Sequence, residues 1–323
     1  CSAPAGEGGN TAASGDTIKV GLLGPYTGKL AVYGLAVKNG ATLYFDKVNA
    51  EGGINGKKVE LISYDNKGDD AEAINAFNRE VDEGITALIG DVITSNTIAV
   101  AGEANAVNMP MITASATDEA VTVNPDDGSV YTNVFRTCFI DPFQGEKMAQ
   151  YAKEKLGYTK AAVIVQTGND YAVGLNEAFK AKCAELGITV VAEEGYATGD
   201  KDFNAQLTNI KAADPEFIFC PNYYEDDGMI VKQARALGLT VPFLGGDGWD
   251  GLEGYATADQ LKDSYFCACY AKGSSTAFED AYKAEYGEAY PNGFAPLGYD
   301  AAMTVVYGIK AAEEQGLEAG SDE

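Results

Sequence analysis

The chain has 323 residues, 46% of them hydrophobic and 22% charged, so it can bury sizeable cores and is long enough for us to expect two lobes. Its 48 acidic and 23 basic residues give a formal net charge of −25, which would repel phosphate backbones and argues against nucleic-acid binding. The sequence contains no histidine, which removes the usual general base, the Ser-His triads and the commonest zinc ligand.

The chain begins with Cys1, followed by residues 2–16, which are rich in Gly, Ala and Ser and lack apolar periodicity. This composition predicts a flexible tether over residues 1–16. A cysteine followed by a tether resembles the start of a mature bacterial lipoprotein, so we expect Cys1 to carry a lipid that attaches the protein to a membrane. No later apolar run is long enough to span a bilayer. The alternative is that Cys1 marks only a boundary of the numbering.

Strands and helices then alternate. Each predicted strand is followed by a helix or a loop, a pattern typical of a parallel doubly wound sheet with helices on both faces. Strands are predicted at 17–25, 57–66, 85–91 and 110–112, and helices at 30–53, 69–84 and 94–107.

The same rhythm restarts after residue 140. Helices are predicted at 143–157, 174–187, 202–214 and 228–238, and strands at 160–166, 188–196, 216–221 and 241–247. Extended segments at 130–138 and 264–272 bracket this second unit and are the predicted crossings between lobes. Helices at 275–287 and 296–316 then return to the first unit. The predicted fold class is α/β, with two doubly wound parallel-sheet lobes joined by a hinge. Its divisions are the tether 1–16, lobe 1 (17–137), lobe 2 (138–269) and the return to lobe 1 (270–323).

None of the six cysteines belongs to a CxxC pair of the redox or zinc type. We expect all but Cys1 to act as small buried hydrophobes. Cys267 and Cys269 alternate along the extended segment 264–272, so their side chains should point to opposite faces and not bond to each other.

Polar and aromatic side chains follow the predicted strands, where an open parallel sheet binds its ligands. In the first lobe, these positions are Pro25 to Thr27, Asp91 to Asn96 and Thr113 to Thr117. In the second lobe, they are Asn169 to Tyr171, Asn222 to Tyr224, Asp247 and Trp249. One side of the expected crevice is therefore rich in hydroxyls and opens a helix, and the other is aromatic and acidic.

These two sides suggest a ligand with two opposite charges. Thr94 and Ser95 lie at a predicted helix N-terminus, which favours an anion, and Ser115 and Thr117 could close around the same carboxylate. Asp247, facing them from the other lobe, would pair with a cation. A carboxylate and an ammonium on neighbouring atoms indicate an α-amino acid.

Each of these residues also has a plainer interpretation. Thr94 and Ser95 could be ordinary helix N-caps. Tyr171 and Tyr223 could be aromatics on the surface of a lobe. Asp247 stands in GGDGWDG, where the glycines could make a turn with a solvated carboxylate.

Several fragments, in this order and spacing, resemble one family. They are GLLGPYTG, AVKNGATLYFDKVNAEGGINGKKVELISYDN, MITASAT, DFNAQLTNIKAADPEFIF, MIVKQARALG, GGDGWDG and PLGYDAA. The chain is similar to the substrate-binding proteins of branched-chain amino acid ABC importers, which have the type I periplasmic binding fold. The resemblance runs from about Thr17 to Gly316.

The resemblance implies a role for nine residues of this chain: Tyr33, Thr94, Ser95, Ser115, Thr117, Tyr171, Tyr223, Asp247 and Trp249. It implies that the hydroxyl residues hold the carboxylate, that the Ser115 carbonyl and Asp247 bind the ammonium, and that the aromatic residues wall the pocket. Asp247 is shorter than the glutamate of the best-known members, a difference that would enlarge the pocket or admit another ligand. Gly68 and Ile93 replace a cysteine pair that some members have.

The resemblance further implies an extracytoplasmic monomer, held at the bacterial membrane through the lipid on Cys1, that delivers its ligand to an ABC permease after hinge closure. An enzyme is disfavoured because phosphate-binding and nucleophile-elbow motifs are missing, and we expect neither a cofactor nor a metal site. A ligand-sensing receptor, or a binder of amides, urea or aromatic acids on the same fold, remains the alternative.

Overall fold

The computed structural model describes residues 17–287, 290 and 292–317, and its strands form two separate parallel sheets. Cys1 and the predicted tether lie outside the described residues. The first sheet has the order β2 (Val59–Asp65), β1 (Ile18–Gly24), β3 (Ala87–Ile89), β4 (Met111–Thr113) and β5 (Val134–Arg136). The second has the order β10 (Tyr265–Phe266), β9 (Phe243–Gly245), β8 (Phe217–Phe219), β6 (Lys160–Gln166) and β7 (Thr189–Tyr196).

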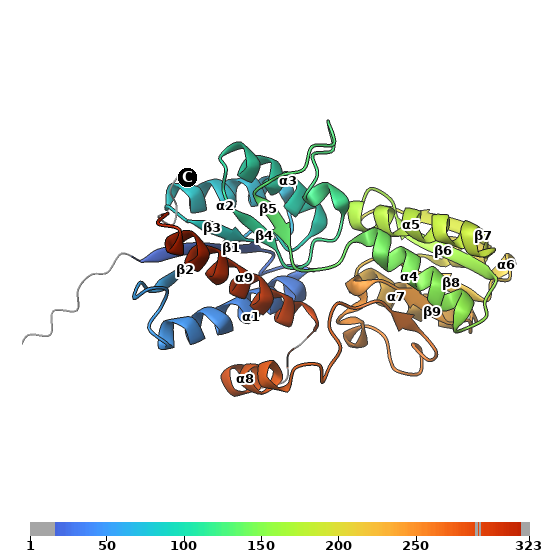
Figure 1. Ribbon diagram of the computed structural model, residues 1–323. Helices are drawn as coiled ribbons and strands as arrows, with labels where there is room; N and C mark the ends of the chain where they lie inside the picture. Colours follow the sequence, from blue (N-terminus) through green and yellow to red (C-terminus); the bar gives the residue numbers. More distant parts are fainter. Residues whose placement is uncertain (1–16, 288–289, 291, 318–323) are drawn as a thin grey trace, which may run out of the picture.

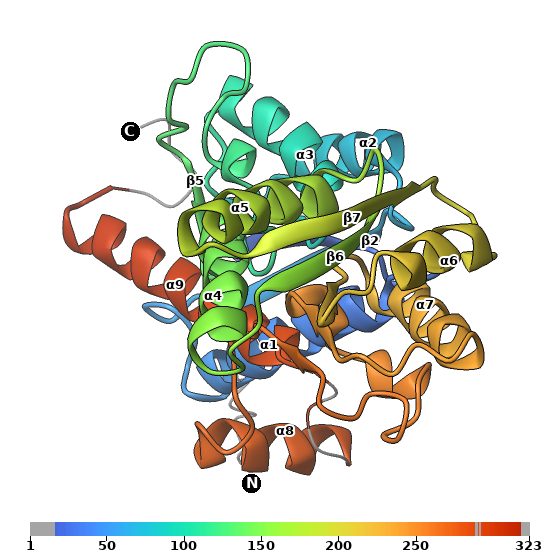
Figure 2. The ribbon, with the colours of Figure 1, turned by 90° about the vertical axis from the view of Figure 1, so that its right-hand side faces the viewer.

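Helices cover both faces of each sheet, and Figure 1 shows the two lobes side by side. In lobe 1, α1 (Ala31–Ala50) and α9 (Phe294–Glu314) pack on one face, and α2 (Asp70–Asp82) and α3 (Thr94–Ala106) on the other. In lobe 2, α4 (Asp141–Glu154) and α5 (Asp170–Leu186) lie opposite α6 (Asn204–Ala212) and α7 (Tyr224–Ala236) (Figure 2). Helix α8 (Thr276–Tyr286) packs against α1.

The continuous apolar runs of the sequence are explained by burial on both faces of a strand. In β6, Ala161, Val163 and Val165 pack in the core under α4 and α5, whereas Ala162 and Ile164 belong to the core on the α6 and α7 side. Successive side chains of a strand point to opposite faces, so a strand covered on both sides needs apolar residues at every position.

Helices α1 and α9 cross at very short range because two glycines lie at the contact. A Cβ at Gly40 would lie 1.8 Å from the Ala295 carbonyl oxygen, and one at Gly298 would lie 2.2 Å from the Val37 carbonyl oxygen. Helix α9, which returns to lobe 1, therefore packs directly against the backbone of α1.

The predicted strands and helices are confirmed, with differences at their ends. Helix α5 begins at Asp170 rather than near 174, because the Asn169 side chain accepts a hydrogen bond from the Ala172 N–H and caps it. Helix α7 begins at Tyr224 rather than 228, with three acidic residues in its first turn, where negative charge is favoured.

Each of the two predicted crossings contains an edge strand, β5 in the first sheet and β10 in the second. Strand β10 ends at Phe266, so Cys267 and Cys269 lie beyond it and strand alternation does not place them. All five described cysteines are free; Cys183 and Cys220 are buried and the others partly buried. The lobe boundaries at 137/138 and 269/270 stay predictions. Among the described residues, no helix is long and apolar enough to cross a membrane.

Candidate ligand-binding site

The carboxyl ends of the strands from both lobes line a small cavity between the sheets. Six of the nine residues predicted for the site line it: Tyr33, Thr94, Ser115, Tyr171, Tyr223 and Asp247. The remaining lining residues are Val92, Ile93, Gly248 and Phe294.

The N-terminus of α3 forms the lobe 1 wall of this cavity. The helix begins at Thr94, which is buried, and no side chain caps its first turn. The first N–H groups of a helix have no partner within the helix, and the positive end of its dipole adds to their field. This wall can therefore bind an anion without a lysine or arginine.

Hydroxyl groups at the end of β4 and just after it hold the loop that leads into α3. The Thr113 hydroxyl donates to the Asp91 carbonyl at 2.6 Å, and the Ser115 hydroxyl donates to the Val92 carbonyl at 2.8 Å. Because its proton is engaged in this bond, the Ser115 hydroxyl offers lone pairs to the cavity. In this arrangement it is suited to accept from an ammonium, and the α3 N–H groups are the donors for a carboxylate.

Asp91 also holds the loop that leads into α3. Its fully buried carboxylate accepts hydrogen bonds from the Val92 and Ile93 N–H groups and from the Asn66 side chain. Burial raises the pKa of Asp91 to about 7, and the two backbone N–H groups oppose this shift. The bonds satisfy the donors just before α3 and leave those of its first turn for a ligand.

Asp247 forms the acidic part of the lobe 2 wall. It is 5% exposed, and its backbone N–H donates to the Gln144 side-chain oxygen at 2.9 Å. Burial raises the pKa of its carboxyl to about 7, although the Tyr171 hydroxyl and the Gln144 amide lower it. No lysine or arginine of the described residues forms an ion pair with Asp247. A cation from outside the protein would complete this wall.

Aromatic side chains join the two lobes around the cavity. The Tyr33 hydroxyl of lobe 1 donates to the Gly248 carbonyl of lobe 2. The Tyr33 ring lies 5.9 Å from the Tyr223 ring and 4.5 Å from the Phe294 ring, and Tyr223 stacks on Tyr171 at 5.0 Å. The structure thus has its lobes in contact, with an aromatic cage between the anion-binding and acidic walls.

Three predicted site residues lie elsewhere. Ser95 faces a second, outer cavity between the lobes. The Thr117 hydroxyl is buried beside the Asp141 carboxyl, whose pKa it lowers, and does not line the inner cavity. The expectation that Trp249 walls the pocket needs correction: its indole N–H donates to the Cys220 carbonyl at 2.8 Å, and its ring packs near Gly245 and Phe266 inside lobe 2.

Sequence reasoning missed four lining residues, of which Phe294 is the largest. It begins α9, the helix that returns to lobe 1, so it follows no strand and is not among the positions at strand ends. Val92 and Ile93 lie within the segment that was singled out, but as apolar residues they were not expected to face a ligand. Gly248 was interpreted as a turn residue.

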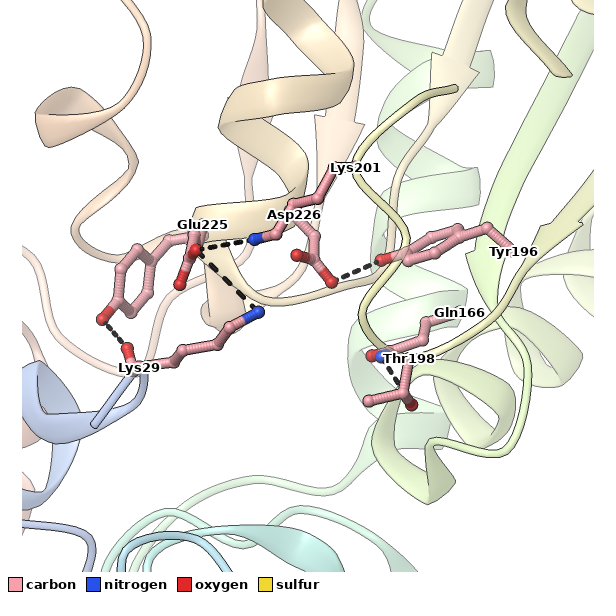
Figure 3. Close-up of polar contacts among 8 residues, drawn as sticks. Lys29, Gln166, Tyr196, Thr198, Lys201, Glu225 and Asp226 are labelled. Carbon is pink, nitrogen blue, oxygen red and sulfur yellow. Dashed lines mark hydrogen bonds and ion pairs between the residues drawn. The ribbon is translucent and has the colours of Figure 1, made fainter. Parts of the chain in front are cut away.

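The outer cavity has a volume of about 320 Å³ and shares Ile93 and Tyr223 with the inner one. Charged residues of both lobes meet at its rim (Figure 3). The Lys29 ammonium lies 3.9 Å from the Glu225 carboxylate, which also pairs with Lys201 at 3.2 Å. The Tyr224 hydroxyl of lobe 2 donates to the Lys29 carbonyl of lobe 1.

Comparison with known proteins agrees with this arrangement. The family model described as periplasmic binding protein matches residues 17–321. A leucine-, isoleucine-, valine-, threonine- and alanine-binding protein of Pseudomonas aeruginosa is 30% identical over 304 residues, which cover 93% of this chain and 79% of that protein.

Solved structures with the same two-lobed fold include the branched-chain amino acid transporter substrate-binding protein LivJ of Streptococcus pneumoniae in complex with isoleucine. It is 36% identical with a TM-score of 0.85, covering 92% of this chain and 85% of that one. A solute-binding protein of an R. palustris ABC transporter in complex with benzoate is 26% identical with a TM-score of 0.79, covering 92% and 81%. The predicted fold class is confirmed.

Proposed function

This chain belongs to the periplasmic binding protein family, and we propose that it binds an α-amino acid with an aliphatic side chain and delivers it to an ABC permease. The observation that carries the proposal is the opposite polarity of the two cavity walls. Unpaired N–H groups of α3 face the cavity from lobe 1, and the unpaired acid Asp247 faces it from lobe 2. A zwitterion is the small ligand that complements both walls at once.

The side chain of the ligand would lie among Tyr33, Val92, Ile93, Tyr223 and Phe294, which are aliphatic or aromatic residues. Such a lining favours an apolar group, and the names of the similar proteins point to leucine, isoleucine and valine. Hydrophobic pockets separate neighbouring aliphatic side chains by only about 1–3 kcal/mol, so we expect one protein to bind several of them.

Closure around the ligand follows from where its two charges would bind. Each lobe holds one charge, so only the closed arrangement contacts both, and the ligand stabilises that arrangement by its differential contacts. The protein would act as a binding protein and not as an enzyme. We further propose that it is an extracytoplasmic monomer, anchored through a lipid on Cys1, which holds it near the permease.

The proposal is tested by thermal-shift and calorimetric titration of the protein after ligand has been stripped by unfolding and refolding. Isoleucine, leucine and valine should bind, whereas isoleucine amide, which lacks the carboxylate, and 3-methyl-2-oxopentanoate, which lacks the ammonium, should bind far more weakly. At about a hundred times its dissociation constant, a ligand stabilises the native state by roughly 2.7 kcal/mol, which visibly moves the melting temperature. Binding of either analogue as tightly as isoleucine would refute the two-charge clamp.

A second candidate is an aromatic acid, because a similar structure holds benzoate and the cavity is rich in aromatic rings. Such a ligand would use the α3 wall but leave Asp247 without a cation. Benzoate and 4-hydroxybenzoate therefore belong in the same titration, where binding of these acids in place of amino acids would favour this candidate.

A further inference from the structure

A second buried acid, Asp141, lies close to the cavity and has no role in the binding of the two ligand charges proposed above. It is 1% exposed and is the first residue of α4, where the chain has just entered lobe 2. Its Oδ2 atom is buried and forms no hydrogen bond of ordinary geometry; the nearest polar influence on the carboxyl is the Thr117 hydroxyl, which is likewise buried without such a bond. A buried carboxylate oxygen without a partner is costly, so its presence calls for a physical reason.

Asp141 connects residues on both sides of the cavity. Its backbone N–H donates to the Thr117 carbonyl of lobe 1 at 2.9 Å. Its Oδ1 atom accepts from the Gln144 side-chain NH₂ at 3.2 Å, and the Gln144 oxygen accepts from the Asp247 N–H at 2.9 Å. Asp141 thereby fixes the orientation of the Gln144 amide, because a flipped amide would set its NH₂ group against the Asp247 N–H.

The charges around Asp141 leave it without a counter-ion. Burial raises the pKa of its carboxyl well above the usual range, and Asp247 and Asp118 add to this effect; the Thr117 hydroxyl and the Arg136 guanidinium oppose it. Arg136 donates its hydrogen bonds to the carbonyls of Ala116 and Asp118 and to the Thr122 hydroxyl, and forms no ion pair with either buried acid.

The field of Asp141 reaches the cavity itself. After burial, Asp141 is the largest cause that raises the pKa of Tyr223, followed by Asp247, and the same two acids raise the pKa of Tyr171. Both tyrosines line the cavity. The charges of both acids thus act on the cavity. No lysine or arginine of the described residues pairs with either acid, so the ammonium of a bound ligand would lower the free-energy cost of ionising both.

We propose that Asp141 is a positioning residue for ammonium recognition. Through Gln144 it holds the loop that carries Asp247, and with Asp247 it forms an acid pair whose negative charge is completed by the ligand cation. This inference rests on the proposed function, because it requires that the ligand carries an ammonium. The acid pair would then release protons when the ligand binds.

The test is calorimetry with isoleucine in two buffers of different ionisation heat, from pH 5.5 to 8.5, which gives both the dissociation constant and the number of protons released. Asp141→Asn keeps the shape and can still accept from Gln144, but it removes the charge. We expect it to weaken isoleucine binding at least about tenfold, the factor that one pKa unit of interaction represents, and to reduce proton release near pH 6.5.

Two further variants separate charge from position. Gln144→Met removes the amide that links the two acids, so affinity should fall about tenfold while proton release changes less than in Asp141→Asn. Asp118→Asn removes a nearby acid that raises the pKa of Asp141 without a hydrogen bond to Gln144, so it should change proton release slightly and leave the affinity close to the parent value. If Asp141→Asn does not fold, the Gln144→Met result decides alone, and unchanged affinity in that variant would overturn the proposal.

The possible results separate a failure of the proposed function from a failure of the role proposed for Asp141. If the parent protein binds no amino acid, the proposed function fails and the role of Asp141 fails with it. If the parent binds isoleucine but Asp141→Asn keeps the parent affinity and proton release, only the inference about Asp141 is overturned. Equal losses of affinity in Asp141→Asn and Asp118→Asn would likewise overturn it, because they would show a general field effect.

Discussion

Replacing Asp247 by alanine should weaken isoleucine binding by about 30-fold to about 4,000-fold. The carboxylate is 5% exposed and has no ion-pair partner among the described residues, so the ligand ammonium would be its only counter-charge. Truncating one partner of a buried, hydrogen-bonded charge pair costs about 2–5 kcal/mol, and about 1.4 kcal/mol corresponds to a tenfold change in the dissociation constant.

The pH dependence gives this prediction a second readout. The pKa of Asp247 is raised to about 7 by burial, and only the ionised form attracts an ammonium. Binding should therefore release protons, and affinity should fall as pH decreases below about 7. In Asp247→Ala this decline should become flatter. Isothermal titration at several pH values measures both effects.

A folding control accompanies the variant. Because the pKa of Asp247 is raised on folding, the folded state binds the proton more tightly, and ionising the group lowers the free energy of unfolding as pH rises towards about 7. Asp247→Ala should thus not destabilise the ligand-free protein at neutral pH through loss of charge, which urea unfolding can check. A folded variant with the parent affinity for isoleucine would refute the role of Asp247.

Three further predictions concern closure and stability. Tyr224→Phe removes the hydrogen bond to the Lys29 carbonyl, which is worth about 0.5–1.5 kcal/mol, so isoleucine should dissociate roughly 2- to 12-fold faster in stopped-flow measurements. Tyr255→Phe, inside lobe 2, is the control. Equal dissociation rates in the parent and both variants would contradict the prediction. Gly40→Ala should lower the free energy of unfolding by about 1–3 kcal/mol in urea titration, whereas Gly102→Ala, whose Cβ meets nothing within 4 Å, should not lower it. Burial raises the pKa of Glu80 to about 9, so the parent should lose stability relative to Glu80→Gln between pH 4.5 and 9; parallel stability curves would argue against this.

The fold could be predicted well because its signals are local. Continuous apolar strands such as residues 160–166, and helices ended by glycines such as Gly84, can be recognised within short windows of sequence. Helix starts were less accurate where a cap lay ahead of the periodic region, as at Asn169. In the extended segment 264–272 only Tyr265–Phe266 forms a strand, because an alternating pattern cannot show where hydrogen bonding to a neighbouring strand ends.

The site was predicted in outline for a different reason. In a parallel sheet, the residues after each strand meet at one edge, so Thr94, Ser115 and Asp247 could be placed together from topology alone. The direction of a side chain within a loop is set by tertiary contacts, which explains why Trp249 was misplaced. Phe294 was missed because it approaches from a helix that returns from far along the chain.

The packing of α9 onto α1 bears on how the chain can fold during synthesis. The sheet of lobe 1 precedes lobe 2 in the sequence, but α9, which covers α1 through Gly40 and Gly298, follows it. A chain that emerges N-terminus first, during synthesis or export, would therefore expose the strands of lobe 1 with the apolar side of α1 still uncovered, while lobe 2, a continuous segment, is completed. Chaperones bind apolar surface that a partly folded chain exposes, so lobe 1 should depend on them for longer than lobe 2.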